Sequence, residues 1–356
     1  MTATPVSSPL RVLAGAEALD ELREHGLRAE RVRAIVGASG GPKWLLLHGL
    51  DRVLFPWLAS GARAPVHAVG SSIGTWRFAC LLAKDPVAAL DRFADAYIAQ
   101  CYQHKPTPAE VTEEGERILT RLLGDDGAPP LVEHALFRLH IVTARFLHLG
   151  ASEGRANLLG FGLAALANTL HRRALATAIE RVVFDAQGDA GPFAPWQSLP
   201  TRHVPLTSEN LRAALMASAA IPGVMSGVRN PPGAPAGVYR DGGVADYHFG
   251  TEIDAPDGLT LYPHFYPYLV PGWFDKSLPW RRTRGLRRVV VLTATPEYVA
   301  ALPNGRIPDR KDFSLMSDAE RMANWRRALD MGRSLGEAFE ELLAKGRIGE
   351  IARPLT

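Results

Sequence analysis

The chain of 356 residues has little cysteine and no long apolar run, and each shortage excludes a class of protein. Cys80 and Cys101 are its only cysteines, which excludes a disulfide framework and a cysteine-rich zinc site. The most apolar stretch, residues 158–170, is shorter than the roughly twenty residues that a helix needs to cross a bilayer. We therefore expect that stretch to be a core or interfacial segment.

Strong charge and targeting signals are also missing. The net charge of +3 is too small to indicate a nucleic-acid partner. The first ten residues lack the basic cluster and apolar run of a signal peptide, and no H-E-x-x-H or comparable spacing indicates a metal. The sequence thus predicts a cytoplasmic protein without a metal or other cofactor.

Short β-branched runs alternate with longer amphipathic stretches, which is typical of an α/β fold with a mainly parallel sheet. Strands are predicted at residues 31–36, 66–70, 139–146, 181–185, 202–206, 237–240, 259–262 and 288–293. Helices are predicted at residues 42–58, 72–84, 87–103, 109–123, 158–179, 209–218 and 318–345. No linker interrupts this pattern, so residues 1–356 are predicted to form one domain with a helical C-terminal region at 318–356.

The clearest motif is Gly70-Ser71-Ser72-Ile73-Gly74, which matches G-x-S-x-G between a predicted strand and a predicted helix. This is the context of a nucleophile elbow, a sharp turn that lifts its serine above the sheet. Ser72 would then lie at a helix N-terminus, where free amides and the helix dipole favour a developing negative charge. The alternative is that Ser71 and Ser72 only cap the helix.

A glycine-rich turn at residues 37–43 also follows a strand and precedes a helix. It fails the phosphate-binding P-loop pattern because Pro42 precedes Lys43 and Trp44 follows it. It fails G-x-G-x-x-G because Ser39 takes the second glycine position. An oxyanion hole fits better, since each well-placed amide can contribute ~3 kcal/mol to an acyl-transfer transition state. A simple tight turn is the alternative.

A third turn, Asp241-Gly242-Gly243, follows a short predicted strand. An aspartate that hydrogen-bonds a serine directly can act as its base, although its usual pKa of about 3.9 makes it a weak base in water. Partial burial would raise the pKa of Asp241, and the two glycines would let the backbone pass close to the site. Taken alone, the turn is equally compatible with an ordinary loop.

In this order and spacing, the three turns together resemble the patatin-like phospholipases. Residues 217–223 (ASAAIPG) add a match to the A-S-x-A-x-P segment before that family's aspartate. The resemblance extends over about residues 31–247. It implies a three-layer α/β/α fold with a mainly parallel central sheet, and an enzyme that cleaves lipid esters, with phospholipids as the best guess for its substrate.

The resemblance also implies a Ser–Asp dyad in place of a triad. Ser72 would attack the ester carbonyl, and Asp241 would take and return its proton. The oxyanion hole would consist of the backbone amides of Gly40, Gly41 and Ile73.

Lys43 matches the basic residue that follows the glycine run of the family, as a supporting residue of the site. The chain departs from the family pattern at Ser39, which replaces the first glycine of the run, and at Trp44, which replaces the glycine after the basic residue. The same serine would also suit an acyltransferase, because an acyl-enzyme can react with an alcohol or thiol in place of water. A catalytically silent binding protein is a third alternative, against which the intact Ser72 and Asp241 argue.

A Ser–His–Asp hydrolase of another α/β class would need a histidine late in the chain. Only His248 and His264 follow Asp241, and both lie near aromatic residues, which favours a packing role. His48, His67 and His171 fall in predicted helices or strands and are also expected to be structural.

Residues 262–288 combine aromatic and basic side chains, a pairing that suits the headgroup region of an anionic membrane. The residues concerned are Tyr262, Phe265, Tyr266, Tyr268, Trp273, Phe274, Trp280, Arg281, Arg282, Arg284, Arg287 and Arg288. We predict peripheral membrane contact through this segment, with buried aromatics beneath an exposed cationic loop as the alternative. Residues 158–176 are predicted to pack in the core, with the lining of an acyl-chain cavity as their alternative role.

Overall fold

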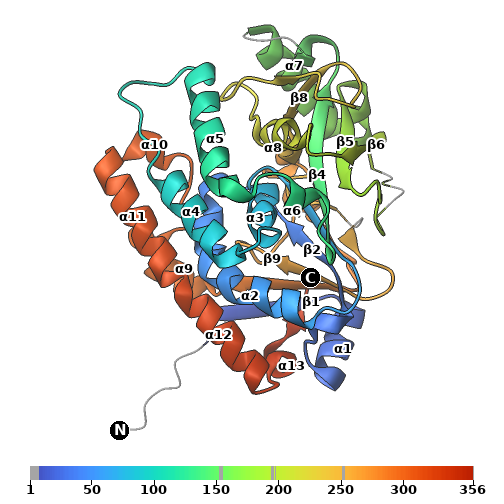
Figure 1. Ribbon diagram of the computed structural model, residues 1–356, viewed down its shortest axis with the longest axis vertical. Coiled ribbons are helices and arrows are strands. Elements are labelled where there is room, and N and C mark those ends of the chain that lie inside the picture. The colour runs from blue at the N-terminus through green and yellow to red at the C-terminus, as the bar shows by residue number, and fades with distance from the viewer. Residues whose placement is uncertain (1–7, 152–154, 194–195, 197, 251–252, 356) are drawn as a thin grey trace.

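One mixed sheet of eleven strands forms the centre of the molecule in the computed structural model, which describes residues 8–151, 155–193, 196, 198–250 and 253–355 (Figure 1). The strand order is β11-β1-β10-β9-β2-β3-β4-β5-β6, and β8 joins the sheet by pairing with β4 and β7. The strands are β1 (Leu10–Ala14), β2 (Val32–Gly37), β3 (Val66–Ser71), β4 (Phe137–Phe146), β5 (Ile179–Ala186), β6 (Thr201–Leu206), β7 (Val228–Arg229), β8 (Val238–Asp241), β9 (Leu259–Pro263), β10 (Val289–Ala294) and β11 (Arg353–Pro354). Antiparallel pairing is confined to β1–β10, β4–β5, β4–β8 and β7–β8, so the sheet is mostly parallel.

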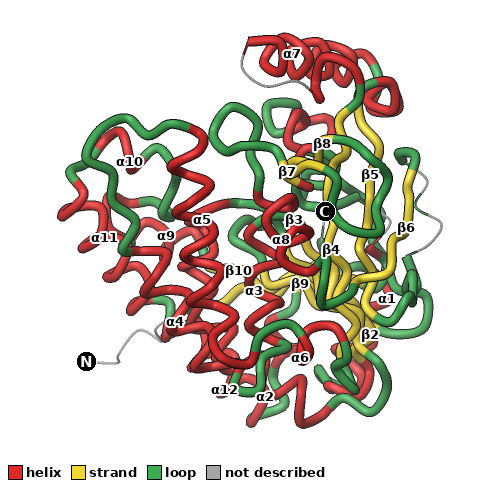
Figure 2. The backbone as a smooth tube through the Cα atoms, turned by 45° about the horizontal axis from the view of Figure 1, so that its top comes forward, coloured by secondary structure: helices red, strands yellow, loops and turns green. Residues whose placement is uncertain are grey.

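Helices flank this sheet. They are α1 (Ala16–His25), α2 (His48–Gly61), α3 (Ile73–Leu81), α4 (Pro86–Ile98), α5 (Pro108–Leu123), α6 (Pro129–Val132), α7 (Arg155–Leu170), α8 (Leu211–Ala219), α9 (Pro296–Ala301), α10 (Asp312–Leu315), α11 (Asp318–Met331), α12 (Arg333–Ala344) and α13 (Ile348–Ile351). α2, α4, α11 and α12 form one group of packed helices, with α11 at the left edge of the molecule in Figure 1. Figure 2 shows α7 at one end of the molecule, beyond the main group of helices. The α/β class predicted from the sequence is confirmed.

The central strands are buried along almost their whole length. Every residue of β10 is buried, and β2 and β3 each have a single half-buried position. The sequences of strands that are covered on both faces are nearly continuous apolar runs. These three strands were recognisable in the sequence for that reason. No helix among the described residues is both long and apolar enough to span a membrane.

The predicted strands are present to within a few residues, but several helical predictions need correction. The helix predicted at 158–179 is wrong in its second half, because α7 ends at Leu170 and β5 begins at Ile179. His171 has an extended backbone there, and its side chain accepts a hydrogen bond from the Arg173 amide, which caps a short 3₁₀ turn (Arg172–Thr177).

Other helical boundaries also differ from the sequence prediction. The helix predicted at 42–58 starts as a 3₁₀ turn (Gly41–Leu47) and becomes α-helical at His48. The closing helical region is divided into α11 and α12 at Gly332. β1 and α1 were not predicted, although Ala18, Leu19 and Leu22 give α1 a buried face at helical spacing.

The register of the sheet brings distant turns to one edge. β2 and β3 are parallel neighbours, with Gly37 opposite Gly70, so the turns that follow them start side by side. β4 continues the register, because its Val142 pairs with Ser71 of β3. Thr143, the next residue of β4, pairs with Asp241 at the end of β8. The serine turn and the aspartate turn are thereby adjacent although β8 follows β3 by more than a hundred residues.

Candidate active site

The serine turn has the geometry of a nucleophile elbow. β3 ends at Ser71, α3 begins at Ile73, and Ser72 between them has φ 53° and ψ −129°. A non-glycine residue at positive φ is strained, and such strain concentrates at functional sites. The turn is also tightly packed, because a Cβ on Gly74 would lie 2.1 Å from the carbonyl oxygen of Gly37. Only glycine therefore permits this approach of α3 to β2.

Asp241 meets the serine directly. The Ser72 hydroxyl donates to Oδ2 of Asp241 at 2.8 Å, and the Gly243 amide donates to Oδ1 at 2.7 Å. Burial raises the pKa of Asp241 from its ordinary value to about 6, against the opposing effects of the Gly243 and Ser72 hydrogen bonds and the charge of Arg310. The expected direction of the shift is confirmed, and a carboxylate with this pKa is a better proton acceptor than one in water.

A chain of hydrogen bonds holds the three turns together. The Ser71 hydroxyl donates to the backbone carbonyl of Asp246 at 2.6 Å and lies 2.8 Å from the hydroxyl of Ser39. The amide of Ser39 donates to the carbonyl of Tyr247 at 2.9 Å. A Cβ on Gly243 would lie 2.4 Å from Oγ of Ser39, so the aspartate turn passes the glycine-rich turn as closely as a glycine allows.

Ser218, within residues 217–223, contacts Ser72 from the other side. Its hydroxyl accepts a hydrogen bond from the Ser72 amide at 2.9 Å and donates to the Val142 carbonyl at 2.7 Å. Two residues later, the carbonyl of Ala220 accepts from the Asp241 amide at 3.0 Å. This segment therefore contacts the backbone of both Ser72 and Asp241.

The amides expected to stabilise an oxyanion lie around the same serine. Gly40 and Gly41 line a cavity with Ser72, and Ile73 is the first residue of α3. Within the described residues, none of these three amides donates to a protein acceptor. Gly41 has φ 55°, and a Cβ on Gly40 would lie 2.5 Å from the Phe265 ring, so both positions favour glycine.

Trp44, where the sequence departs from the family pattern, is accommodated as a core residue. It is fully buried, and its ring stacks on Phe93 with centroids 4.3 Å apart. The large side chain thus points into the packing between the glycine-rich turn and α4 and does not line either cavity beside Ser72.

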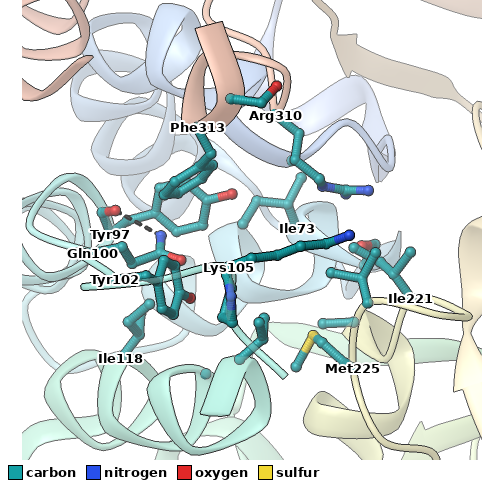
Figure 3. Close-up of a pocket in the computed structure, with 18 of the residues that line it drawn as sticks. Ile73, Tyr97, Gln100, Tyr102, Lys105, Ile118, Ile221, Met225, Arg310 and Phe313 are labelled. Carbon is teal, nitrogen blue, oxygen red and sulfur yellow. Dashed lines mark hydrogen bonds between the residues drawn. The ribbon is translucent and has the colours of Figure 1, made fainter. Parts of the chain in front are cut away.

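Two cavities meet at Ser72. The larger, of about 620 Å³, extends between α3, α5 and the segment after α8, and Figure 3 shows its lining. Its walls are mostly apolar, with Lys105 extending across it and Arg310 at one edge (Figure 3). The apolar lining residues include Ile73, Trp76, Pro106, Val111, Ile118, Ala219, Ile221, Val224, Met225 and Phe313.

The smaller cavity, of about 400 Å³, is the charged one. Besides Ser72 and Asp241, it is lined by the cationic residues Lys43, Lys276, Arg310 and Lys311 and by Asp309. Lys43 is buried and forms an ion pair with Asp309. The amino group of Lys276 lies over the Tyr247 ring, 4.7 Å from its centroid, and burial together with the charge of Lys43 lowers the pKa of Lys276 to about 8.

No histidine contacts the serine or the aspartate in the described part of the chain. His248 and His264 are fully buried with ring centroids 4.3 Å apart, and Nδ1 of His248 accepts from the Val270 amide at 3.3 Å. Burial lowers the pKa of His248 far below its usual value and that of His264 to about 3. Both rings therefore stay neutral in the core, as expected for packing residues.

Of the cations of the smaller cavity, only Lys43 is predicted from the sequence. Lys276 falls within the segment predicted to contact a membrane, and Arg310 and Lys311 lie in a polar stretch without a recognisable motif. The only signal was the run of charged residues at 309–312, a pattern that solvated loops share. Among the described residues, no cluster of histidine, cysteine and carboxylate side chains could hold a metal.

Comparison with protein-family models finds no match to this chain, and a search of curated proteins finds no relative of it. The interpretation of the site therefore depends on its own geometry.

Proposed function

We propose that the chain is a serine acyl hydrolase that cleaves carboxylic esters of long-chain acyl groups through Ser72 and Asp241. The observation that carries the proposal is the 2.8 Å hydrogen bond from the Ser72 hydroxyl to a buried carboxylate with no histidine between them. The resemblance to patatin-like phospholipases adds the three-layer α/β/α arrangement and lipid esters as the substrate class.

In the first half of the reaction, Asp241 takes the proton of Ser72 as Oγ forms a bond to the ester carbonyl carbon. The amides of Gly40, Gly41 and Ile73 donate to the resulting oxyanion, and the N-terminus of α3 adds a favourable dipole. When the tetrahedral adduct collapses, the bond to the alcohol oxygen breaks, and the protonated Asp241 returns its proton to that oxygen.

In the second half, a water molecule attacks the acyl-enzyme while Asp241 accepts one of its protons. Collapse of the second adduct releases the carboxylic acid and returns the proton to Ser72 Oγ. The net reaction consumes one ester and one water, and it releases one acid and one alcohol.

The two cavities suit the two parts of such an ester. The apolar cavity of about 620 Å³ has the size and lining of a site for a long acyl chain. The cationic cavity of about 400 Å³ would then receive the alcohol part, and its lysines and Arg310 favour an alcohol that carries a phosphate or carboxylate.

Labelling with a fluorophosphonate probe tests the proposal, because such probes react with activated serines whatever the natural substrate is. We expect labelling of the wild-type protein and none of Ser72→Ala. Ser314→Ala is the matched control, since Ser314 also lines the larger cavity but donates to the Lys311 carbonyl and not to a carboxylate. Equal labelling of Ser72→Ala and the wild type would refute the proposal. Product analysis with an added alcohol then separates hydrolysis from acyl transfer.

A further inference from the structure

α7 exposes a continuous row of leucines. Leu159, Leu163, Leu166 and Leu170 are 57%, 53%, 64% and 82% exposed, although burial was predicted for this stretch. Their spacing of four, three and four residues puts them on one face of the helix. The opposite face is anchored, because Asn168 is buried and donates to Oδ1 of Asp275 at 2.8 Å. The prediction that residues 158–176 pack in the core is therefore wrong for this face.

Two tryptophans of residues 262–288 are also exposed. Trp273 and Trp280 are 39% and 72% exposed, whereas Tyr262 and Phe265 of the same predicted membrane segment are buried. The Trp273 ring packs on Phe161 of α7 with centroids 5.3 Å apart, but Phe161 lies on the side of the helix opposite the leucines. We therefore call the four leucines alone the apolar face. They make up four of the seven large exposed hydrophobic residues in the described part of the chain, and the others are Trp273, Trp280 and Leu315.

The surroundings of the apolar face are cationic. Arg173 is exposed three residues after Leu170, and Arg281 donates to the Asn168 carbonyl of α7 at 3.2 Å. Residues 159–173 and 273–284 include a single carboxylate, Asp275, which is buried and paired with Arg172. An apolar surface bordered by cations matches the interface of an anionic bilayer, where leucine enters the acyl boundary and arginine meets the headgroups.

The other side of α7 borders the candidate active site. Phe161 and Trp273 line the smaller cavity together with Ser72 and Asp241. A lipid surface at the apolar face would therefore be separated from this cavity by the thickness of one helix.

We propose that the apolar face docks on the surface of a lipid bilayer that contains anionic headgroups. The bilayer is favoured over a protein partner because arginines adjoin the exposed leucines, and an anionic phospholipid surface complements both kinds of side chain. This docking goes beyond the proposed function and does not depend on it, since the contacts that carry it lie outside the dyad.

The test is vesicle co-sedimentation of the Ser72→Ala protein, which cannot turn over lipid. Vesicles of phosphatidylcholine alone are compared with vesicles in which phosphatidylglycerol replaces part of it, at low and at high salt. We expect binding to the anionic vesicles that weakens with salt. The added substitutions Leu163→Gln and Leu166→Gln should reduce this binding at least about tenfold, because two apolar anchors are lost. Leu315→Gln is the matched control and should bind as the parent does.

Three results would overturn the docking proposal. The first is that the Ser72→Ala protein binds neutral and anionic vesicles equally, or binds neither. The second is that the Leu163/Leu166 variant binds anionic vesicles as well as its parent does. The third is that this variant loses self-association, which would show that a second copy covers the face. Hydrolysis of a dissolved short-chain ester by the Leu163/Leu166 variant with Ser72 intact should stay at the wild-type rate, so failure of docking and failure of the hydrolase proposal give different results.

Discussion

Asp241 and Asp246 lie five residues apart on one turn, yet their surroundings differ completely. Both are buried, with exposed fractions of 7% and 0%. Asp241 accepts hydrogen bonds from the Ser72 hydroxyl and the Gly243 amide, and within the described part of the chain it forms no ion pair. Asp246 accepts two hydrogen bonds of 2.6 and 2.7 Å from the Arg181 guanidinium and a longer one of 3.4 Å from Arg172.

The comparison shows which surroundings would suit a buried carboxylate to act as a base and which suit it to a structural role. A buried carboxylate with only neutral donors is poorly stabilised in its charged form, so it gains from accepting a proton. A buried carboxylate held by a guanidinium is stabilised as an anion, and its loss leaves the arginine without its counter-charge. Under the proposed function, the same turn would thus provide proton transfer at Asp241 and cohesion of the site at Asp246.

The largest expected effect is on activity at the dyad. Ser72→Ala and Asp241→Asn should each lower hydrolysis of a p-nitrophenyl ester about a thousandfold or more, because the nucleophile or its base is lost. Unfolding in urea should show both proteins folded, with Asp241→Asn at least as stable as the wild type at neutral pH, because burial of the ionised carboxylate opposes folding there. Retained turnover in Asp241→Asn would mean that another group accepts the proton.

Asp246→Asn should show the opposite pattern, a large loss of stability with little loss of activity per folded molecule. Removing one partner of a buried pair costs about 3–5 kcal/mol in the free energy of unfolding. Replacing both Asp246 and Arg181 by apolar residues should recover part of this loss, since no buried charge is then left alone. An unaltered urea midpoint in Asp246→Asn would show that the ion pair contributes nothing to stability.

The pH dependence of kcat/KM should follow Asp241. The carboxylate must be ionised to accept a proton, so activity should rise with pH through about 6. The folded-state pKa lies above the ordinary value of 3.8, so this group's contribution to stability should fall as pH rises from below 3.8 to above 6. Asp241→Asn should remove that part of the stability profile. A midpoint of the activity profile near pH 4 would indicate that burial does not raise the pKa of Asp241.

A smaller effect is expected at the charged cavity. Lys276→Met or Arg310→Met should raise KM about three- to tenfold for a dissolved ester whose alcohol carries a phosphate, through the loss of one charge-assisted contact. KM for the matching neutral ester should stay the same. High salt should reduce the difference in KM between the variant and the wild type for the phosphate ester. An equal rise in KM for both esters would indicate that the substitution alters the shape of the cavity and not its recognition of charge.

The smallest effect is expected for the histidines. His248→Ala and His264→Ala should keep activity per folded molecule within the wild-type order of magnitude, because neither ring contacts the dyad. Both should lose about 1–3 kcal/mol of stability, since a buried side chain is truncated. Abolished activity in either variant with an intact fold would favour a triad.

The turns on β2 and β3 could be predicted because each is local, a strand followed by glycines and a helix, and the sheet register brings them together. Asp241 could be named only from its motif, since nothing local shows that it pairs with Thr143 beside the serine strand. Lys43 could be named from its motif, but the other charged residues of the smaller cavity could not, because Lys43 and Asp309 meet across 266 residues of sequence. The exposed leucines of α7 were missed because an apolar helix has the same pattern whether protein or lipid covers it.

The rate of fluorophosphonate labelling at Ser72 in Asp241→Asn and Asp246→Asn tests the central claim most directly, because it measures activation of the hydroxyl without a substrate. With folded protein at neutral pH, Asp246→Asn should be labelled at nearly the wild-type rate and Asp241→Asn at least about a hundredfold more slowly. Labelling of Asp241→Asn at the wild-type rate would contradict the assignment of Asp241 as the base of Ser72.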